Sequence, residues 1–298
     1  MECIDQDFHQ LLWSEWVKPR KLVKGGPLPE GVPREPGVYR IRVASEPVIA
    51  YFGESGNLAD RVVDTWQDIN QSRSGRGRAD VFRHLVEKSV GYLISYCIDV
   101  GPHPYDLTSE RERRCLERCL GWLCRLKTGL SPFGNYSRAG QGNQLISDTT
   151  EAGNPKEVYA PGLVHPSTRA LRPNGREPSH KRWMDLRWSE PVTYRQLKRA
   201  GSESPEGFIA EEMNRGPAVY KLLDESGELL QVGSRKHVHQ GLQSLLYNCP
   251  NGFTAAWTPL PRKALKLEAR EIVDDIIGAY YFETGQMPTY QFKTVFDG

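Results

Sequence analysis

The feature that most constrains the fold is an internal repeat, in which the same landmarks occur twice in one order. The triplet "WSE" at 13–15 returns at 188–190, and the strand start "GVYRI" at 37–41 returns as "AVYKL" at 218–222. Each half then has a second apolar strand and closes with a long helix that ends in Thr-Gly, three residues before a proline. Since 298 residues exceed one small core, the repeat predicts two copies of one α+β module.

Each copy is predicted to form a small three-stranded antiparallel sheet flanked by helices. Apolar and β-branched runs around a short turn predict a β-hairpin, and apolar residues at helical spacing predict the helices. In the first copy, strands are expected at 36–44, 47–53 and 91–100, and helices after an Asn57 cap, at 79–88 and at 108–126. In the second copy, strands are expected at 218–223, 228–233 and 252–260, and helices at 237–247 and 263–283.

The last helix of the first copy carries clear start and stop signals. Thr108 or Ser109 is expected to cap its beginning, because acidic residues follow in the first turn. Gly129 and Pro132 are expected to end it, because glycine closes helices readily and proline cannot continue them.

These patterns divide the chain into a first module at 1–137, a Gly/Pro-rich basic linker at 138–183 and a second module at 184–298. The linker lacks hydrophobic periodicity, so it is either a partly ordered connection or a strap that wraps DNA. Between its hairpin and third strand, the first copy has about twenty residues that the second cannot match, including the basic stretch 71–84. The first copy is therefore expected to own an extra basic helix.

Composition places the chain among ordinary globular proteins. It is 38% hydrophobic and 26% charged, with a net charge of +2 and six cysteines that do not resemble a disulfide framework. No apolar run approaches the 18 or so residues that span a bilayer, and the polar, acidic N-terminus is unlike a secretory signal. The chain is therefore expected to be cytoplasmic, without a membrane partner.

One short motif set in the first copy points to a known class of enzyme. The words "GVY" and "YFG" lie on the two hairpin strands, Arg61 follows Gly53 by eight residues, and Glu117 lies on the last helix. In order and layout, residues 37–136 resemble the GIY-YIG nuclease family, which is named for two such tripeptides. The second copy resembles the family in layout only.

The resemblance assigns a role to each matching residue. Tyr39 and Tyr51 would face the scissile phosphate, and one of them would deprotonate or orient the attacking water. Arg61 would bind phosphate oxygens, Glu117 would hold a single Mg²⁺ or Mn²⁺ ion per active site, and Asn135 would support the site. Two further residues are open alternatives: Glu112, which aligns with Glu268 of the second copy, could replace Glu117 as the metal ligand, and His84 could relay a proton or contact phosphate.

The chemistry of these residue types agrees with such a site. A phenol with a pKa near 10 is a poor base unless a cation lowers that pKa, so tyrosine needs arginine or a metal ion nearby. A carboxylate is a hard oxygen ligand that suits Mg²⁺, and the guanidinium fork of arginine matches phosphate oxygens.

The second copy keeps one of these residues and loses the others. Tyr220 matches Tyr39, but glutamine, glycine, valine and glutamine stand where the second tyrosine, the arginine, the glutamate and the asparagine are expected, at Gln231, Gly241, Val273 and Gln291. The second copy is therefore expected to be inert, and either to bind DNA or to act as a structural partner.

The sequence thus predicts a metal-dependent endonuclease that cuts double-stranded DNA, most simply a site-specific restriction-type enzyme that dimerises transiently. Structure-specific or single-strand cleavage, and DNA binding by two inactive copies, are the alternatives. Basic residues expected to contact the nucleic acid are Arg73, Arg76, Arg78, Arg83, Lys181, Arg182 and Lys236.

Overall fold

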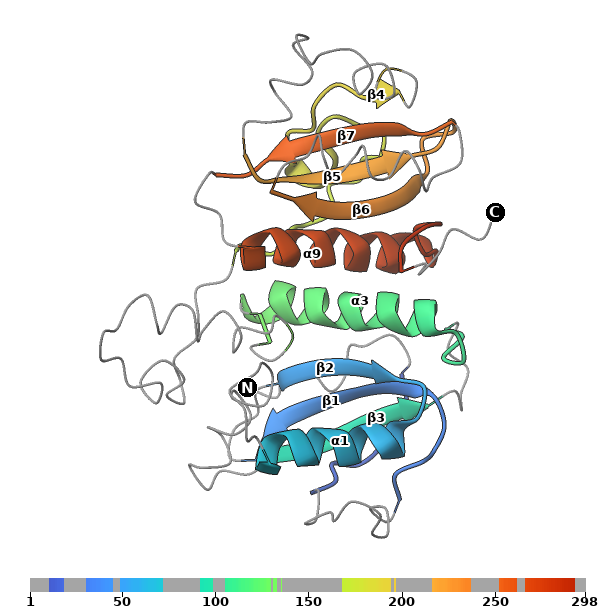
Figure 1. The fold of residues 1–298 in the computed structure, drawn as a ribbon, viewed down its shortest axis with the longest axis vertical. Helices are drawn as coiled ribbons and strands as arrows, with labels where there is room; N and C mark the ends of the chain where they lie inside the picture. The colour runs from blue at the N-terminus through green and yellow to red at the C-terminus, as the bar shows by residue number, and fades with distance from the viewer. Residues whose placement is uncertain are drawn as a thin grey trace, which may run out of the picture. The chain divides into compact units, whose positions relative to one another are not determined.

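The computed structural model shows a mixed α+β protein whose residues fall into two compact units, divided between Ser167 and Thr168 (Figure 1). It describes residues 11–18, 31–44, 49–71, 92–98, 105–129, 131–132, 135, 168–193, 196, 216–236, 252–261 and 266–292. Among these residues, no helix is long and apolar enough to cross a membrane. The expected helices at 79–88 and 237–247 lie outside the described residues.

The first unit is built on a three-stranded antiparallel sheet with the strand order β2-β1-β3. Its strands are β1 (Gly37–Val43), β2 (Ile49–Ser55) and β3 (Tyr92–Ile98). Two helices are described, α1 (Leu58–Gln71) and α3 (Glu110–Thr128). The hairpin and the third strand therefore lie where the sequence predicts them, and α3 runs alongside the edge strand β2 (Figure 1).

Local signals begin both helices and end α3 as predicted. The Asn57 side chain accepts a hydrogen bond from the Asp60 backbone N–H at 3.2 Å, which caps α1. The Ser109 hydroxyl accepts one from the Glu112 N–H at 3.4 Å at the start of α3. Gly129 ends α3 in the left-handed conformation, with φ of 75°, which glycine adopts without strain.

The core of the first unit lies on the sheet face that α1 covers. Tyr39, Ile41, Tyr51 and Ile94 pack there with buried residues of α1, among them Leu58. Leu58 closes over β1 at Gly37, where a methyl group would meet its Cδ1 atom at 2.8 Å. This packing fixes α1 against the strands that carry both tyrosines.

The second unit has a four-stranded sheet with the order β4-β7-β5-β6. Its strands are β4 (Val192–Thr193), β5 (Ala218–Leu223), β6 (Leu229–Arg235) and β7 (Thr254–Pro259), and its long helix is α9 (Lys266–Thr284). A 3-10 turn, η1, covers Trp183–Asp185.

The prediction of three strands in the second unit is wrong by one strand. Val192 and Thr193 pair with Ala255 and Thr254 of β7 and so add the short β4. In the first unit the described residues that follow the "WSE" triplet, 16–18, form an isolated bridge between Val17 and Ile94. A two-residue ladder gives no hydrophobic alternation from which a strand could be predicted.

The repeated landmarks make the same contacts in both units. In the first unit the Ser14 N–H donates to the Tyr96 carbonyl at 2.8 Å, and the Tyr96 N–H donates to the Ser14 hydroxyl at 3.0 Å. In the second unit Ser189 and Trp257 repeat the pair at 2.8 and 3.1 Å. The two units thus use the repeated triplet to hold the outer side of the third strand.

The two hairpins also match in register. Tyr39 lies opposite Gly53 in the first hairpin, and Tyr220 lies opposite Gly233 in the second. Each first strand has a register shift shortly after its tyrosine, following Ile41 in the first unit and Leu222 in the second. The side chains at corresponding positions therefore point to corresponding faces.

Candidate active site

The two tyrosines of the predicted motif lie side by side on one face of the first sheet. Their ring centroids are 5.7 Å apart, and the rings are inclined by 43°. Tyr39 is 2% exposed and Tyr51 is 4% exposed. The structure therefore places the two phenols together, within the packed face between the sheet and α1.

Gly53 makes room for both rings. A methyl group on Gly53 would stand 2.5 Å from Cζ of Tyr39, 2.6 Å from its hydroxyl and 2.5 Å from Cε1 of Tyr51. Carbon atoms in proteins do not approach so closely, so only glycine fits beneath the tyrosine pair. Sequence reasoning used this glycine as a landmark and missed its packing role, although its place in "YFG" is the signal.

Arg61 lies on α1, one helical turn after the Asn57 cap, and its side chain is partly exposed. Its backbone N–H donates to the Asn57 carbonyl at 3.1 Å, so the helix is fully formed where the arginine projects. Because α1 packs on the tyrosine face, Arg61 belongs to the element that covers both phenols.

Asn135 occupies the outer edge of β2. Its amide oxygen accepts from the Phe52 N–H at 2.8 Å, and its Nδ2 donates to the Phe52 carbonyl at 2.7 Å. The side chain thus satisfies both backbone groups of an edge residue, as a further strand would do. Phe52 lies between Tyr51 and Gly53, so Asn135 fixes the backbone that carries the phenol.

Glu117 lies next to this contact. Its Oε1 accepts from Asn135 Nδ2 at 3.4 Å and from Arg118 Nη1 at 3.2 Å, and the residue is 8% exposed. Glu112, the alternative metal ligand, lies near Tyr105, whose phenol has its pKa raised to about 12 by burial, with contributions from Cys119 and Glu112. The contact with Asn135 therefore associates Glu117 with the edge of β2.

The long interval between Glu117 and Asn135 departs from the expected family spacing. The two side chains nevertheless touch, although 18 residues separate them. α3 continues to Thr128, Gly129 ends it, and a turn in which the Asn135 N–H donates to the Pro132 carbonyl at 3.1 Å brings the asparagine back.

A partly buried ion pair that sequence reasoning missed fixes α3 to the same strand. Arg113 Nε donates to Glu54 Oε2 at 3.1 Å. Its Nη1 also donates to the carbonyls of Leu107 and Thr108, at 2.9 and 2.8 Å. In the sequence, the only signal is that a glutamate directly follows the "YFG" word and that an arginine lies some sixty residues later. This pair holds the helix that carries Glu117 against β2.

The remaining predicted residues are not part of this arrangement. His84 and the basic residues Arg73, Arg76, Arg78 and Arg83 lie outside the described residues. Lys181 and Arg182 are exposed in the second unit, and Lys236 is exposed directly after β6.

The corresponding position of the second unit keeps the scaffold with different chemistry. The Gln291 side chain accepts from the Val232 N–H at 3.0 Å, as Asn135 accepts from Phe52. Tyr220 packs over Gly233, where a methyl group would stand 2.5 Å from its Cζ. Gln231 stands where the first unit has its second tyrosine, and Val273 stands where it has Glu117. The second unit therefore lacks the second phenol and the carboxylate at these positions.

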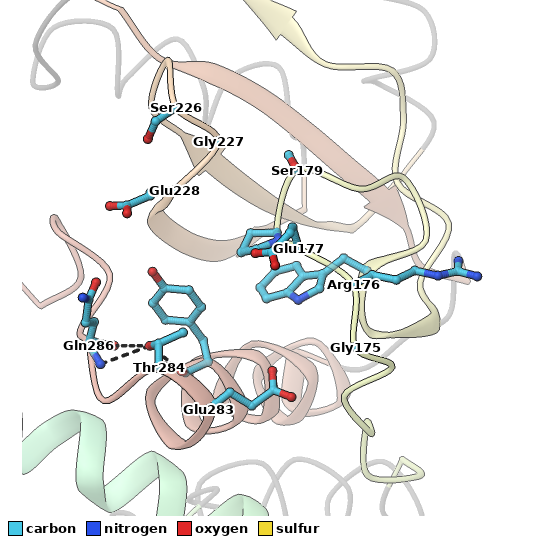
Figure 2. A pocket seen from close by; sticks show the side chains of 13 residues that line it. Gly175, Arg176, Glu177, Ser179, Ser226, Gly227, Glu228, Glu283, Thr284 and Gln286 are labelled. Atoms are coloured by element: carbon cyan, nitrogen blue, oxygen red, sulfur yellow. Dashed lines mark hydrogen bonds between the residues drawn. The ribbon is translucent and has the colours of Figure 1, made fainter.

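A cavity of about 690 Å³ lies elsewhere in the second unit (Figure 2). Glu177, Glu228 and Glu283 line it together with Tyr280. Burial and the charge of Glu177 raise the pKa of Glu283. The lining also includes Arg176, so three carboxylates face one cation and the cavity is acidic on balance, which does not favour a nucleic-acid backbone inside it.

Comparison of the chain with protein-family models, curated proteins and solved structures finds no match. The residues of the site and the contacts that they make, together with the motif resemblance, therefore indicate what the site can do.

Proposed function

We propose that the chain is a metal-dependent DNA endonuclease built from two tandem GIY-YIG-like modules, the first active and the second degenerate. The observation that carries this proposal is that four residues of the motif lie on or near β2. Tyr39 and Tyr51 share the room above Gly53, while Asn135 joins the same strand to Glu117. Four of the five motif residues, from positions 39 to 135, thus lie on β2, on its neighbour β1 or in contact with the edge of β2, while Arg61 lies on α1.

Glu117 is the carboxylate that would hold a magnesium ion, and the Arg118 guanidinium pairs with one of its oxygens at 3.2 Å. Asn135 and Arg118 both donate to Oε1, and the described residues donate no hydrogen bond to Oε2. No group of three or more acidic, histidine or cysteine side chains that could hold a metal occurs among the described residues. Mg²⁺ tolerates such a sparse set, because it keeps several waters and binds substrate phosphates through one or two carboxylates. When bound at Glu117, the ion would supply positive charge to a phosphate oxygen.

The chain's own residues have separate tasks in the proposed hydrolysis. One tyrosine of the Tyr39–Tyr51 pair orients the attacking water or, as the phenolate, takes up its proton. The P–O bond to the leaving oxygen breaks as the new P–O bond forms, and the leaving oxygen takes a proton from solvent water. Arg61 binds the phosphate oxygens and stabilises the charge that develops on them. Asn135 is a positioning residue, because it holds both the strand of Tyr51 and the carboxylate of Glu117.

The substrate and the mode of cutting follow from the same proposal. Double-stranded DNA is the substrate, and a site-specific, restriction-type reaction is the preferred form. With one active module per chain, two chains would meet transiently to cut both strands. Structure-specific or single-strand cleavage, and binding without cleavage, are the outcomes against which this proposal is tested.

Supercoiled plasmid incubated with the full chain in Mg²⁺ and, separately, in EDTA tests the proposal. We expect discrete linear fragments in Mg²⁺ and intact plasmid in EDTA. A smear would indicate a relaxed nuclease, and fragments from single-stranded or branched DNA alone would indicate a structure-specific one. A mobility shift with uncut plasmid in Mg²⁺ or Mn²⁺ would contradict the nuclease proposal.

A further inference from the structure

We propose that residues 168–190 of the second unit, here called the basic strap, bind the phosphate backbone of duplex DNA. The choice of DNA rests on the nuclease proposed above. The strap runs from the boundary of the two units to β4 and, within its span, has one short regular element, η1. It overlaps the end of the predicted linker and carries the Lys181 and Arg182 of the predicted nucleic-acid contacts.

The strap presents six cations to solvent. Six exposed basic side chains lie on it, and none forms an ion pair or hydrogen bond through its charged group with another described residue: Arg169, Arg172, Arg176, Lys181, Arg182 and Arg187. Of its three exposed acids, Asp185 accepts from Asn174 at 2.9 Å, Glu177 lines the cavity and Glu190 lies at the end of the strap. The strap therefore carries a net positive charge.

Buried acids fix one end of the strap. Glu271 Oε2 accepts from the backbone N–H and the hydroxyl of Thr168, at 2.7 and 2.8 Å. Asp275 Oδ2 accepts from the Leu171 N–H at 2.9 Å. Both carboxylates lie on α9 and are 0% exposed. Burying an acid is costly unless it is paired, so these three hydrogen bonds offset part of that cost and attach the strap to α9.

A buried lysine fixes the middle of the strap. Lys221 on β5 donates to the carbonyl of Pro178 and, at 3.4 Å, to that of His180. Its ammonium lies 4.4 Å from the ring centroid of Trp188 and 5.3 Å from that of Trp183. Burial lowers the pKa of Lys221 to about 7, while the two carbonyls and two indole faces favour its charged form. The strap is thus held from inside at several points.

This inside-out arrangement suits a long polyanion. Glu271, Asp275 and Lys221 bind the inner side of the strap, and the basic side chains lie on its exposed side. These side chains are spread over some twenty residues, a stretch too long for one small anion to contact. A backbone that is already fixed loses little entropy on binding, and arginine forks match phosphate oxygens. Strap residues 175–179 and Trp183 form one wall of the acidic cavity, and Figure 2 shows the Arg176 side chain directed away from Glu228 and Glu283.

The test is fluorescence anisotropy of a labelled duplex with the full chain in EDTA, where cutting does not interfere, at a series of salt concentrations. The strap variant combines Arg176→Gln, Lys181→Gln and Arg182→Gln, which leave the backbone anchors in place. We expect affinity to fall about ten- to hundred-fold. The salt dependence should also weaken, by about 0.9 in the log–log slope for each phosphate that the variant no longer neutralises.

A matched variant removes the same charge from exposed residues of the first unit, through Lys18→Gln, Arg34→Gln and Lys127→Gln. Equal reductions of affinity in both variants would overturn the proposal, because net charge alone would then explain them. Wild-type binding to phosphatidylserine vesicles but not to the duplex would overturn it as well. If the chain does not cut DNA in Mg²⁺ but the strap variant lowers the salt-dependence slope, the nuclease proposal is wrong and the strap proposal holds. If the chain cuts DNA but the strap variant leaves that slope unchanged, the strap proposal is wrong and the nuclease proposal holds.

Discussion

Replacing Glu117 with glutamine is expected to reduce Mg²⁺-dependent cleavage at least about a thousand-fold with little loss of stability. Glutamine keeps the side-chain shape and an amide oxygen that can still accept from Asn135 and Arg118, which now contact Oε1. It removes the negative charge that would hold the metal ion, and losing that interaction is worth several kcal/mol in the transition state. Single-turnover cleavage of a short duplex, with circular dichroism melting of the same samples, measures both quantities.

Glu112→Gln is the matched control, since it makes the same change on the same helix. Glu112 lies in the first turn of α3, near Tyr105, where a carboxylate adds about 0.3–1 kcal/mol through the helix dipole. Cleavage by this variant should stay within a few-fold of wild type. A large loss of cleavage activity in Glu112→Gln, together with full activity in Glu117→Gln, would mean that Glu112 rather than Glu117 is the metal ligand.

Placing a methyl group on Gly53 is expected to abolish cleavage and to destabilise the first unit by about 1–3 kcal/mol. The new Cβ would stand 2.5 Å from Cζ of Tyr39 and 2.5 Å from Cε1 of Tyr51, so both rings must move. Displacement of a reacting group by about 1 Å already costs roughly a hundred-fold in rate. Cleavage rate and urea unfolding of Gly53→Ala test the two effects together.

Gly233→Ala repeats the same steric change in the second unit. Its Cβ would stand 2.5 Å from Cζ of Tyr220, so a similar loss of stability is expected there. Cleavage at a temperature where the chain stays folded should remain near the wild-type rate. If both alanine variants lose activity equally, general destabilisation rather than the Tyr39–Tyr51 pair explains the effect, and the site assignment is wrong.

The elements predicted from sequence are those with strong local signals. The hairpin of the first unit, the Asn57 and Ser109 caps and the Gly129 stop all follow from residues within a few positions of one another. The "WSE" repeat predicted that both halves share one arrangement of strands and helices. Ser14 and Ser189 make matching hydrogen bonds to the third strand of their own units, as such an arrangement requires. Hydrophobic periodicity and helix capping involve residues that are close in sequence, so the elements they define can be predicted without knowledge of the tertiary structure.

The contacts that build the candidate site were beyond such reading, because they join distant segments. Asn135 reaches the backbone of Phe52 across 83 residues, and Arg113 reaches Glu54 across 59. The resemblance named Glu117 and Asn135, but only the fold brings them into contact despite their unusual spacing. The sequence indicates that Lys221 could reach phosphates, but the structure buries it against Trp183 and Trp188 of a strap more than thirty residues earlier.

The most direct test of the central claim compares Tyr39→Phe with Tyr220→Phe, two single-oxygen deletions at buried tyrosines that lie opposite a glycine in matching hairpins. Single-turnover cleavage of duplex DNA in Mg²⁺ is the measurement, with binding in EDTA recorded for each variant. The account predicts that Tyr39→Phe binds normally and cuts at least about a hundred-fold more slowly, while Tyr220→Phe cuts at the wild-type rate. Wild-type cutting by Tyr39→Phe would contradict it.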